Sequence, residues 1–208
     1  MEEDEFLTVK SVGESQTRIM ASRFLGVAFP CASAEDFGQR LDAERKRYYD
    51  ATHWCYACRV GYGADLQEKS SDAGEPHGTA GLPILREIQS RQLTDCGVIV
   101  IRYYGGTKLG TGNLGRAYGE CAALALDNCK FVTRTILDIL HVDASYDDQG
   151  LVYHWSSQHS AIVEPRDSIE HAAFTVKIRG REVPHFIQHL TDASSGRIKI
   201  AEAGQWIS

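Results

Sequence analysis

The sequence predicts an α+β protein of two domains, a mixed βα domain at residues 1–132 and a ferredoxin-like domain at residues 133–208. Three observations support this prediction. First, 43% hydrophobic and 24% charged residues in a chain of 208 are ordinary for a globular protein with its own core. Second, segments with strand-like alternation are mixed with segments of helical periodicity. Third, after "CKFVTRT" the pattern changes and reads βαββαβ, which is the ferredoxin-like arrangement.

The first domain is predicted to begin with two or three antiparallel strands. The segments "EFLTVKS" and "QTRIMASRFLGVAFPC" alternate and are rich in β formers, and Gly13-Glu14 between them is predicted to form a turn. A helix then begins at Ser33, because Ser33-Ala-Glu-Asp36 is a capping-box pattern, and ends near Tyr49. The next predicted strand is "HWCYACRV", residues 53–60.

Two glycine-rich loops follow, and each leads into a helix. The first, "GYGADLQEKSSDAGEPHGTAG", is too long for a simple connection, and long loops in compact domains are commonly functional. Thr79 or Gly81 is predicted to cap a helix that carries Pro83 in its first turn and runs to about Arg91. The segment "CGVIVIRYY" is predicted to be a strand buried on both faces. The second loop ends in a helix from Leu114 to about Asn128.

The second domain is predicted to contain two helices and four strands. Its histidines show no spacing typical of a metal site, so core or surface positions explain them. The predicted strands are 136–143, 161–165, 172–179 and 197–201, and the predicted helices are 147–159 and 182–193.

Charge and composition exclude several classes of protein. The net charge of −6 excludes a globally basic nucleic-acid-binding protein. Residues 1–134 carry 16 basic and 18 acidic side chains and residues 135–208 carry 6 and 10, so a polyanion site is expected as a local basic patch in the first part. The acidic start "MEEDEF" and the lack of a long apolar run predict a cytoplasmic protein without a membrane span. The six cysteines do not form a disulfide framework.

The stretch "YYGGTKLGTGNLGRAYG" contains the pattern G-x-G-x-x-G at residues 110–115. A dinucleotide site needs the first glycine directly after the strand and an acidic residue about 20 positions later, and both conditions fail here. A phosphate-binding Walker motif also fails, because no G-K-[ST] is present. No cofactor is therefore expected.

The same loops do favour an anion of the phosphate or sulfate type. Each delivers the chain to the start of a helix, where free N–H groups and the helix dipole attract negative charge. The alternative is that the glycines only make tight turns and that the nearby cations are solvated. The predicted anion- or nucleic-acid-binding residues are Gly78, Thr79, His77, Arg102, Tyr103, Gly105, Gly106, Lys108 and Arg116.

A second candidate chemistry uses His53 and Cys55, which are two residues apart on one face of a strand. An imidazole beside a thiolate could activate a nucleophile, with Glu75 or Asp72 orienting the histidine. The alternative is a buried, inert cysteine. No metal site is expected: Cys55-x-x-Cys58 lacks a second ligand pair for zinc, and the weak candidates for Mg²⁺ are Asp72 and Glu75.

The motifs "ATHWCYACR", "GEPHGTAGLPILREIQ" and "VIRYYGGTKLGTGNLGRAYG" together resemble the YigZ/IMPACT family. The resemblance covers roughly residues 15–130 by motif, and the βαββαβ segment agrees with the bacterial YigZ branch. The family pattern usually has Ser where this chain has His77, and Phe where it has Tyr104. It usually has Gly at the position of Asn113, and asparagine tolerates a positive φ better than most residues.

The resemblance implies a first domain similar to ribosomal-protein and translation-factor domains, and a second similar to the terminal domain of elongation factor G. It implies a connection with translation, since eukaryotic relatives regulate translation during amino-acid starvation, partly through a domain absent from this sequence. It implies no secure enzymatic activity. We therefore expect a non-enzymatic protein that binds RNA or a ribosome-associated protein. The alternatives are a hydrolase or transferase that uses Cys55 and His53, and a protein-interaction module whose acidic second domain docks a basic partner.

Overall fold

The computed structural model describes residues 4–207 and divides into two compact units. The larger unit comprises Phe6–Thr133, and the smaller comprises Asp4 and Glu5 together with residues 134–207. Both units combine helices with an antiparallel sheet, so the predicted α+β class is confirmed.

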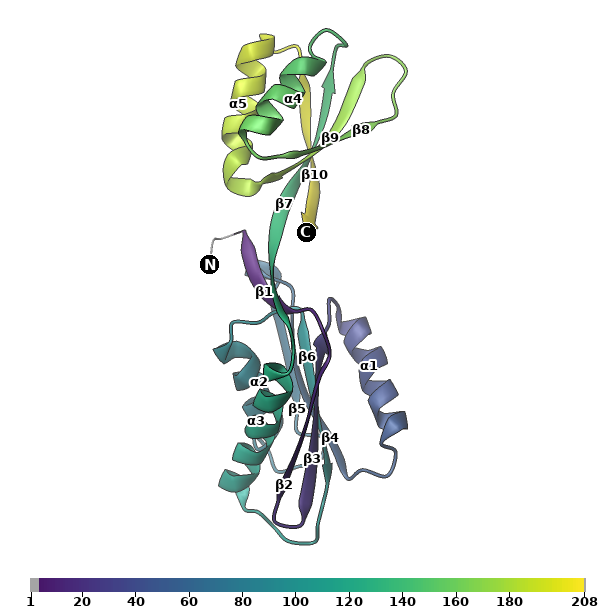
Figure 1. Cartoon of the computed structure of the whole chain (residues 1–208), viewed down its shortest axis with the longest axis vertical. Coiled ribbons are helices and arrows are strands. Elements are labelled where there is room, and N and C mark those ends of the chain that lie inside the picture. The colour runs from purple at the N-terminus through teal and green to yellow at the C-terminus, as the bar shows by residue number, and fades with distance from the viewer. Residues whose placement is uncertain (1–3, 208) are drawn as a thin grey trace. The chain divides into compact units, whose positions relative to one another are not determined.

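The larger unit is built on a sheet with the strand order β2-β3-β6-β4-β5. Helices α2 and α3 cover one face of this sheet and α1 covers the other (Figure 1). Strand β6 lies at the centre and is buried on both faces along most of its length, as its apolar run predicts. The elements are β1 (Glu5–Val9), β2 (Gly13–Ile19), β3 (Ser22–Pro30), α1 (Ala34–Arg47), β4 (His53–Val60), β5 (Gln67–Ser71), α2 (Gly81–Ser90), β6 (Cys96–Tyr103) and α3 (Thr111–Asp127).

Most elements of the larger unit were predictable from pattern. Ser33 caps α1 as expected, with its Oγ accepting a hydrogen bond from Asp36 N at 3.0 Å. The turn predicted at Gly13-Glu14 is wrong, because Gly13 begins β2 and the chain reverses at Met20, which has a positive φ of 52°. A side chain at Gly13 would meet the carbonyl oxygen of Ala125 at 2.1 Å, so this glycine permits close contact between strand and helix.

The first predicted loop contains structure that the sequence pattern did not reveal. Residues 63–65 form a short 3-10 turn, and β5 pairs with β4 at the edge of the sheet. Because β5 is "QEKSS" at an exposed edge, it shows no alternation of apolar and polar residues. The loop that remains between β5 and α2, residues 72–80, carries the segment "DAGEPHGTA".

The smaller unit has the predicted order βαββαβ. Its four strands lie in the order β10-β7-β9-β8, all antiparallel, and β1 also pairs with β7. Its core includes Val142, Phe174, Val176, Phe186 and Leu190. The elements are β7 (Phe131–Ala144), α4 (Gln149–Gln158), β8 (Ile162–Arg166), β9 (Ala172–Arg179), α5 (Val183–Ser194) and β10 (Lys199–Ile207).

The first and last strands of this unit are longer than predicted. Strand β7 begins at Phe131 and β10 continues to Ile207, whereas the sequence pattern indicated 136–143 and 197–201. The N-terminal strand is also placed differently from expectation, since β1 pairs with β7 and not with β2 or β3. The exposed ends of these strands contain few apolar residues, so the hydrophobic pattern does not show where each strand ends. The end of such a strand is determined by its pairing with the neighbouring strand.

Candidate functional site

The two glycine-rich loops border two neighbouring hollows in the larger unit. One is a cavity of about 460 Å³ beside His53, Glu75 and Arg102, which we call the His53 cavity. The other is a groove of about 580 Å³ between α2 and α3, lined by Arg86 and Arg116 among others, which we call the α2–α3 groove. Thr111 lines both hollows. The first loop contributes Pro76 to the cavity and Gly78 to the groove, so both loops reach both hollows.

The first loop is closed by the carboxylate of Asp72. Its Oδ1 accepts hydrogen bonds from the N–H groups of Ala80 at 2.9 Å and Gly81 at 2.8 Å, and its Oδ2 accepts from Gly78 N at 2.8 Å. Burial opposes the charge on Asp72, but these three hydrogen bonds outweigh it and lower the pKa of the carboxyl below its usual range. The start of α2 therefore already holds an anion that belongs to the protein.

This arrangement corrects two predicted contacts. The N–H groups of Gly78 and Thr79 were expected to bind a phosphate, but Gly78 N donates to Asp72 and Thr79 N donates to the carbonyl of Pro76 at 3.1 Å. The prediction that Thr79 or Gly81 caps α2 is also wrong, because Ala80 is the N-cap residue and the capping carboxylate comes from Asp72. A side chain at Gly81 would meet Ser71 N at 2.7 Å, so only glycine fits this close approach.

The start of α3 is different, because it is open. Its N-cap is Gly110, whose φ of +77° favours glycine, and no side chain caps the helix. Leu114 N donates to the carbonyl of Gly110 at 2.9 Å, while the N–H groups of residues 111–113 have no acceptor among residues 4–207. Unsatisfied N–H groups at the positive end of a 17-residue helix favour an anion.

Three exposed cations lie along these hollows. Lys108 lines the His53 cavity, and Arg86 and Arg116 line the α2–α3 groove. Within the described part of the chain none of the three forms an ion pair. Lys108 and Arg116 were predicted as site residues, but Arg86 was not. The sequence offered one indication of Arg86: it lies three residues after Pro83, on the same face of the amphipathic helix α2.

Arg102 is not available as a phosphate contact in the way that was predicted. Its side chain is only 5% exposed, and Nη1 donates to Glu75 Oε1 at 2.6 Å while Nη2 donates to Ser22 Oγ at 3.2 Å. Glu75 Oε1 also accepts a hydrogen bond from the hydroxyl of Tyr118 at 2.8 Å. The two side chains form a buried ion pair, so Arg102 positions Glu75 at the wall of the His53 cavity.

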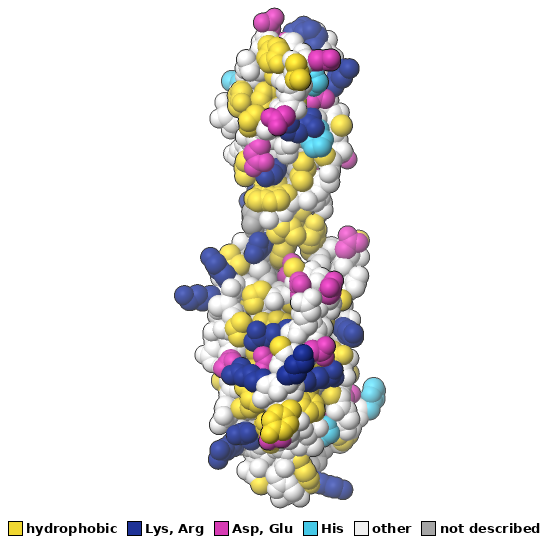
Figure 2. All heavy atoms as spheres, turned by 90° about the vertical axis from the view of Figure 1, so that its right-hand side faces the viewer, with side chains coloured by type: hydrophobic (Ala, Val, Ile, Leu, Met, Phe, Trp, Pro, Cys, Tyr) yellow, Lys and Arg dark blue, Asp and Glu magenta, His cyan; other side chains and the backbone are white. Residues whose placement is uncertain are grey.

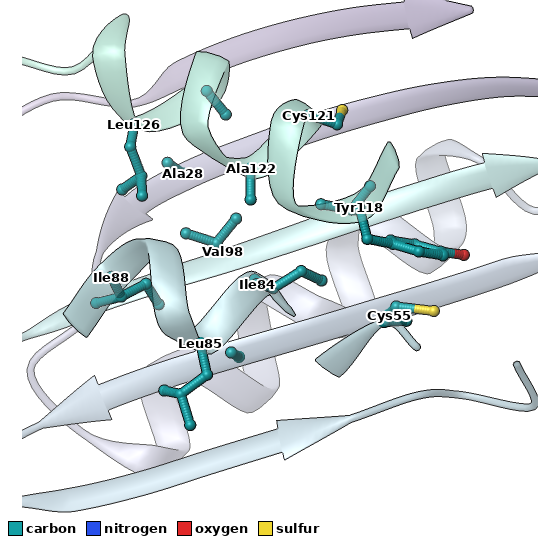
Figure 3. Packing of buried hydrophobic residues seen from close by; sticks show 14 of the residues in the cluster. Ala28, Cys55, Ile84, Leu85, Ile88, Val98, Tyr118, Cys121, Ala122 and Leu126 are labelled. Carbon is teal, nitrogen blue, oxygen red and sulfur yellow. The ribbon is translucent and has the colours of Figure 1, made fainter. Parts of the chain in front are cut away.

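Cys55 is not an activated nucleophile, which corrects the alternative that used it. Its side chain lies in the core below α2 and α3, next to Tyr118 (Figure 3). Its Sγ donates to the carbonyl of Asp72 at 3.0 Å. Burial raises the pKa of the thiol to about 12, and the neighbouring hydroxyl of Tyr118 only partly offsets this. A thiol in this state stays protonated at neutral pH and behaves as a small apolar group.

His53 remains at the wall of its cavity, with its side chain 20% exposed. Its Nδ1 lies 2.9 Å from the carbonyl oxygen of Ala73, and its Nε2 lies 3.8 Å from Glu75 Oε1. His53 and Cys55 do lie on one face of β4, as the spacing predicts, but only the histidine reaches a hollow.

Comparison with known proteins gives a consistent result. The Impact N-terminal domain matches residues 20–126, which includes all of the loops and helices that form the two hollows. The IMPACT family member YvyE of Bacillus subtilis is 31% identical over 197 residues, 95% of this chain and 90% of that protein. The chain belongs to the IMPACT family.

Other IMPACT-family relatives extend over most of this chain. The family member YigZ of Escherichia coli is 29% identical over 183 residues, 88% of this chain and 90% of that protein. A crystal structure described as that of a hypothetical protein superimposes with a TM-score of 0.68 at 26% identity, and the match covers 96% of this chain and 98% of that one. The resemblance found by motif is therefore confirmed over both units.

Other predicted anion contacts of this IMPACT-family chain lie away from the hollows or are already engaged. The hydroxyl of Tyr103 donates to Asp50 Oδ1 at 2.9 Å, and Arg23 stacks on its ring. Gly105 N donates to Ser22 Oγ at 3.3 Å, because the loop lies against Ala21 with no room for a side chain. Gly106 is exposed and has a φ of +86°. His77 is fully exposed and has its Nδ1 3.7 Å from Asp72 Oδ2.

The weak metal candidates Asp72 and Glu75 serve other purposes. Asp72 accepts three backbone hydrogen bonds, and Glu75 is paired with Arg102. Among residues 4–207 no group of three or more His, Cys, Asp or Glu side chains is arranged to hold a metal ion. The same residues include no helix that is both long enough and apolar enough to cross a membrane.

The face that carries α1 has a different charge pattern. Basic and acidic side chains are interspersed there (Figure 2), and arginines of α1 form ion pairs such as Arg40 with Glu44 at 2.9 Å and Arg47 with Glu14 at 2.9 Å. Because these charges compensate each other locally, this face attracts an anion less strongly than the α2–α3 groove does.

In the smaller unit, two histidines meet that no sequence pattern connects. His159 Nε2 lies 3.0 Å from His189 Nδ1, and His159 Nδ1 lies 2.8 Å from Glu182 Oε2. The hydrogen bond with His159 lowers the pKa of Glu182 below its usual range. Trp155 stacks on His189 with a ring separation of 4.3 Å. A separation of 30 residues between the two histidines is not a recognisable motif, so only the fold reveals this contact.

Proposed function

We propose that this protein is a non-enzymatic, cytoplasmic binding protein connected with the regulation of translation, and that it holds RNA phosphates in the α2–α3 groove. The observation that carries the proposal is the set of three cations that form no ion pair with any described residue, Arg86, Lys108 and Arg116, in the linings beside the open start of α3. The net charge of the chain is −6, so the three cations form a local basic patch on an acidic protein.

The geometry of α3 supports phosphate over a neutral ligand. Gly110 turns the chain so that the N–H groups of residues 111–113 have no acceptor among the described residues, and Arg116 follows on the next turn. Gly112 and Gly115 keep the groove wall free of side chains near the helix start. Two acidic side chains also line the groove: Glu87, which is paired with Arg91, and Glu120, about one turn beyond Arg116 on α3.

The resemblance to the IMPACT family, which implies a connection with translation, supports this part of the proposal. RNA is the polyanion that a translation-connected protein meets at high concentration. Guanidinium groups bind phosphate oxygens in a bidentate way, which suits two exposed arginines on facing helices. A groove of this kind would read the RNA backbone and not the bases.

The test is binding of a single-stranded RNA oligonucleotide to the full chain, measured by fluorescence anisotropy across a series of salt concentrations. Three phosphate contacts predict that log K falls with log salt at a slope of about −2. Arg116→Ala and Lys108→Ala should each weaken binding and make the slope shallower by about 0.7. Arg45→Ala is the matched control, because Arg45 is an exposed arginine on α1.

Two results would contradict the proposal. One is an affinity that does not change with salt. The other is an equal loss of affinity in Arg116→Ala and in the α1 control. If RNA binding is found, co-sedimentation with purified ribosomes then tests whether the bound RNA is ribosomal.

A further inference from the structure

We infer that the His53 cavity is a binding site for a small phosphate monoester whose alcohol part carries a hydroxyl group. The cavity of about 460 Å³ lies within the size range of small-molecule sites. It combines an apolar wall, which includes Leu109 and Leu114, with a small number of polar groups. It adjoins the α2–α3 groove, but the inference concerns a different class of ligand and does not depend on RNA binding.

The hydrogen bonding of His53 determines which ring nitrogen faces a ligand. Because the carbonyl oxygen of Ala73 can only accept, the Nδ1 that lies 2.9 Å from it carries the proton. In the neutral ring Nε2 then has a free lone pair. Nε2 is 3.8 Å from Glu75 Oε1, too far for a hydrogen bond, so it is free to accept one from a ligand hydroxyl.

The charges at the back of the cavity compensate each other. Glu75 and Arg102 are both about 5% exposed and form an ion pair at 2.6 Å, with Tyr118 as a further donor to Glu75. The Nε–H of Arg102 is buried and has no acceptor among residues 4–207. Because this Nε–H is buried, the groups left to contact a ligand in the cavity are those of His53, Lys108 and Thr111.

The remaining charge in the cavity is positive. Lys108 has no ion pair within the described residues, and Gly110 and Thr111 bring the open start of α3 into the lining. Several N–H groups, a threonine hydroxyl and an ammonium group match the oxygens of a phosphate better than those of a neutral group. The phosphate would therefore lie toward Lys108 and Thr111, with the alcohol part directed toward His53.

The experiment compares two probes on the full chain by isothermal titration calorimetry, without RNA. Inorganic phosphate reports the phosphate end alone, and glycerol 3-phosphate reports both ends. We expect glycerol 3-phosphate to bind about fivefold to tenfold more tightly, since one additional hydrogen bond contributes on this scale. Lys108→Gln should weaken both probes by a similar factor.

The variant His53→Asn separates the two ends. Its amide nitrogen can take the place of Nδ1 toward Ala73 O, while the Nε2 acceptor is lost. It should reduce the affinity for glycerol 3-phosphate to that for inorganic phosphate and leave inorganic phosphate unchanged, which also shows that the variant is folded. In the unmodified protein, the ¹⁵N NMR signal of His53 Nε2 should shift with glycerol 3-phosphate and much less with inorganic phosphate.

The inference is overturned if glycerol 3-phosphate does not bind at millimolar concentration. It is also overturned if the two probes bind equally and the His53 Nε2 signal responds to neither. Because RNA binding is measured separately through Arg116, failure of that proposal and failure of this one are distinct results.

Discussion

The carboxylate of Glu75 accepts a hydrogen bond from the guanidinium of Arg102 at 2.6 Å, although the two residues are 27 positions apart and both are buried. Glu75 belongs to the loop between β5 and α2, and Arg102 to the central strand β6. The pair therefore fastens the first glycine-rich loop to the sheet. Its contribution to stability and its contribution to binding can be tested separately.

Removing one partner of this pair should destabilise the larger unit strongly. Glu75→Leu leaves the buried guanidinium of Arg102 without its counter-ion, which typically costs about 3–5 kcal/mol in the free energy of unfolding. Urea denaturation followed by circular dichroism measures the change. Arg47→Ala is the control, because Arg47 and Glu14 form an exposed pair, for which we expect less than about 1 kcal/mol. Equal changes in the two variants would show that burial of the Glu75–Arg102 pair is unimportant.

Asp72 should make stability depend on pH in the acidic range. The pKa of Asp72 is lowered in the folded protein, so its contribution is fully present above the unfolded value of about 3.9 and is lost as the pH falls through the lower folded value. Asp72→Asn should cost about 1–2 kcal/mol at pH 7, as for other helix caps. The difference between the two proteins should shrink below about pH 4. A difference that stays constant from pH 7 to pH 3 would contradict this role.

Two glycines in the first turns of α2 and α3 should respond oppositely to alanine. Gly81→Ala places a Cβ at 2.7 Å from Ser71 N and should destabilise the protein. A Cβ added at Gly112 would have no neighbouring atom within 4 Å, and Gly112 lies in α3. Gly112→Ala should therefore be neutral or stabilise the protein by up to about 1 kcal/mol. Thermal melts of both variants provide the comparison. Destabilisation by Gly112→Ala would mean that this glycine meets a constraint other than space.

Cys55 should react slowly with alkylating reagents. With a pKa of about 12 and no exposed surface, its modification by iodoacetamide at pH 8.5 should be roughly a hundredfold slower than in the urea-unfolded chain. Peptide mass spectrometry distinguishes it from Cys129, which is partly exposed and serves as the internal reference. Rapid labelling of Cys55 in the folded protein would contradict this prediction and support the alternative in which Cys55 is a nucleophile.

The sequence was sufficient to predict the fold where the signal is local. Periodicity located β4, β6, β9 and all five α-helices to within a few residues, because each depends on its own apolar face. Strand β5 was missed since an edge strand of polar residues has no such face. The pairing of β1 with β7 was missed because it joins segments more than 100 residues apart.

The candidate site was predicted in part for a similar reason. Glycine-rich loops before helices indicated where anions could bind, and Lys108 and Arg116 do lie beside the hollows. The partners of Asp72 and Arg102 could not be read from spacing, because the sequence does not show which carboxylate reaches which donor. Those contacts engage Gly78 and Arg102, two of the nine residues predicted to bind an anion.

The capping of α2 by Asp72 has a consequence for stoichiometry. Two loops that look alike in the sequence do not give two equivalent sites, since the chain's own carboxylate permanently occupies the start of one helix. Of the two described helix starts that follow a glycine-rich loop, that of α3 is the one left for an external phosphate. Saturation with inorganic phosphate should therefore reach one equivalent per chain there, and Asp72→Ala should create a second, weaker equivalent.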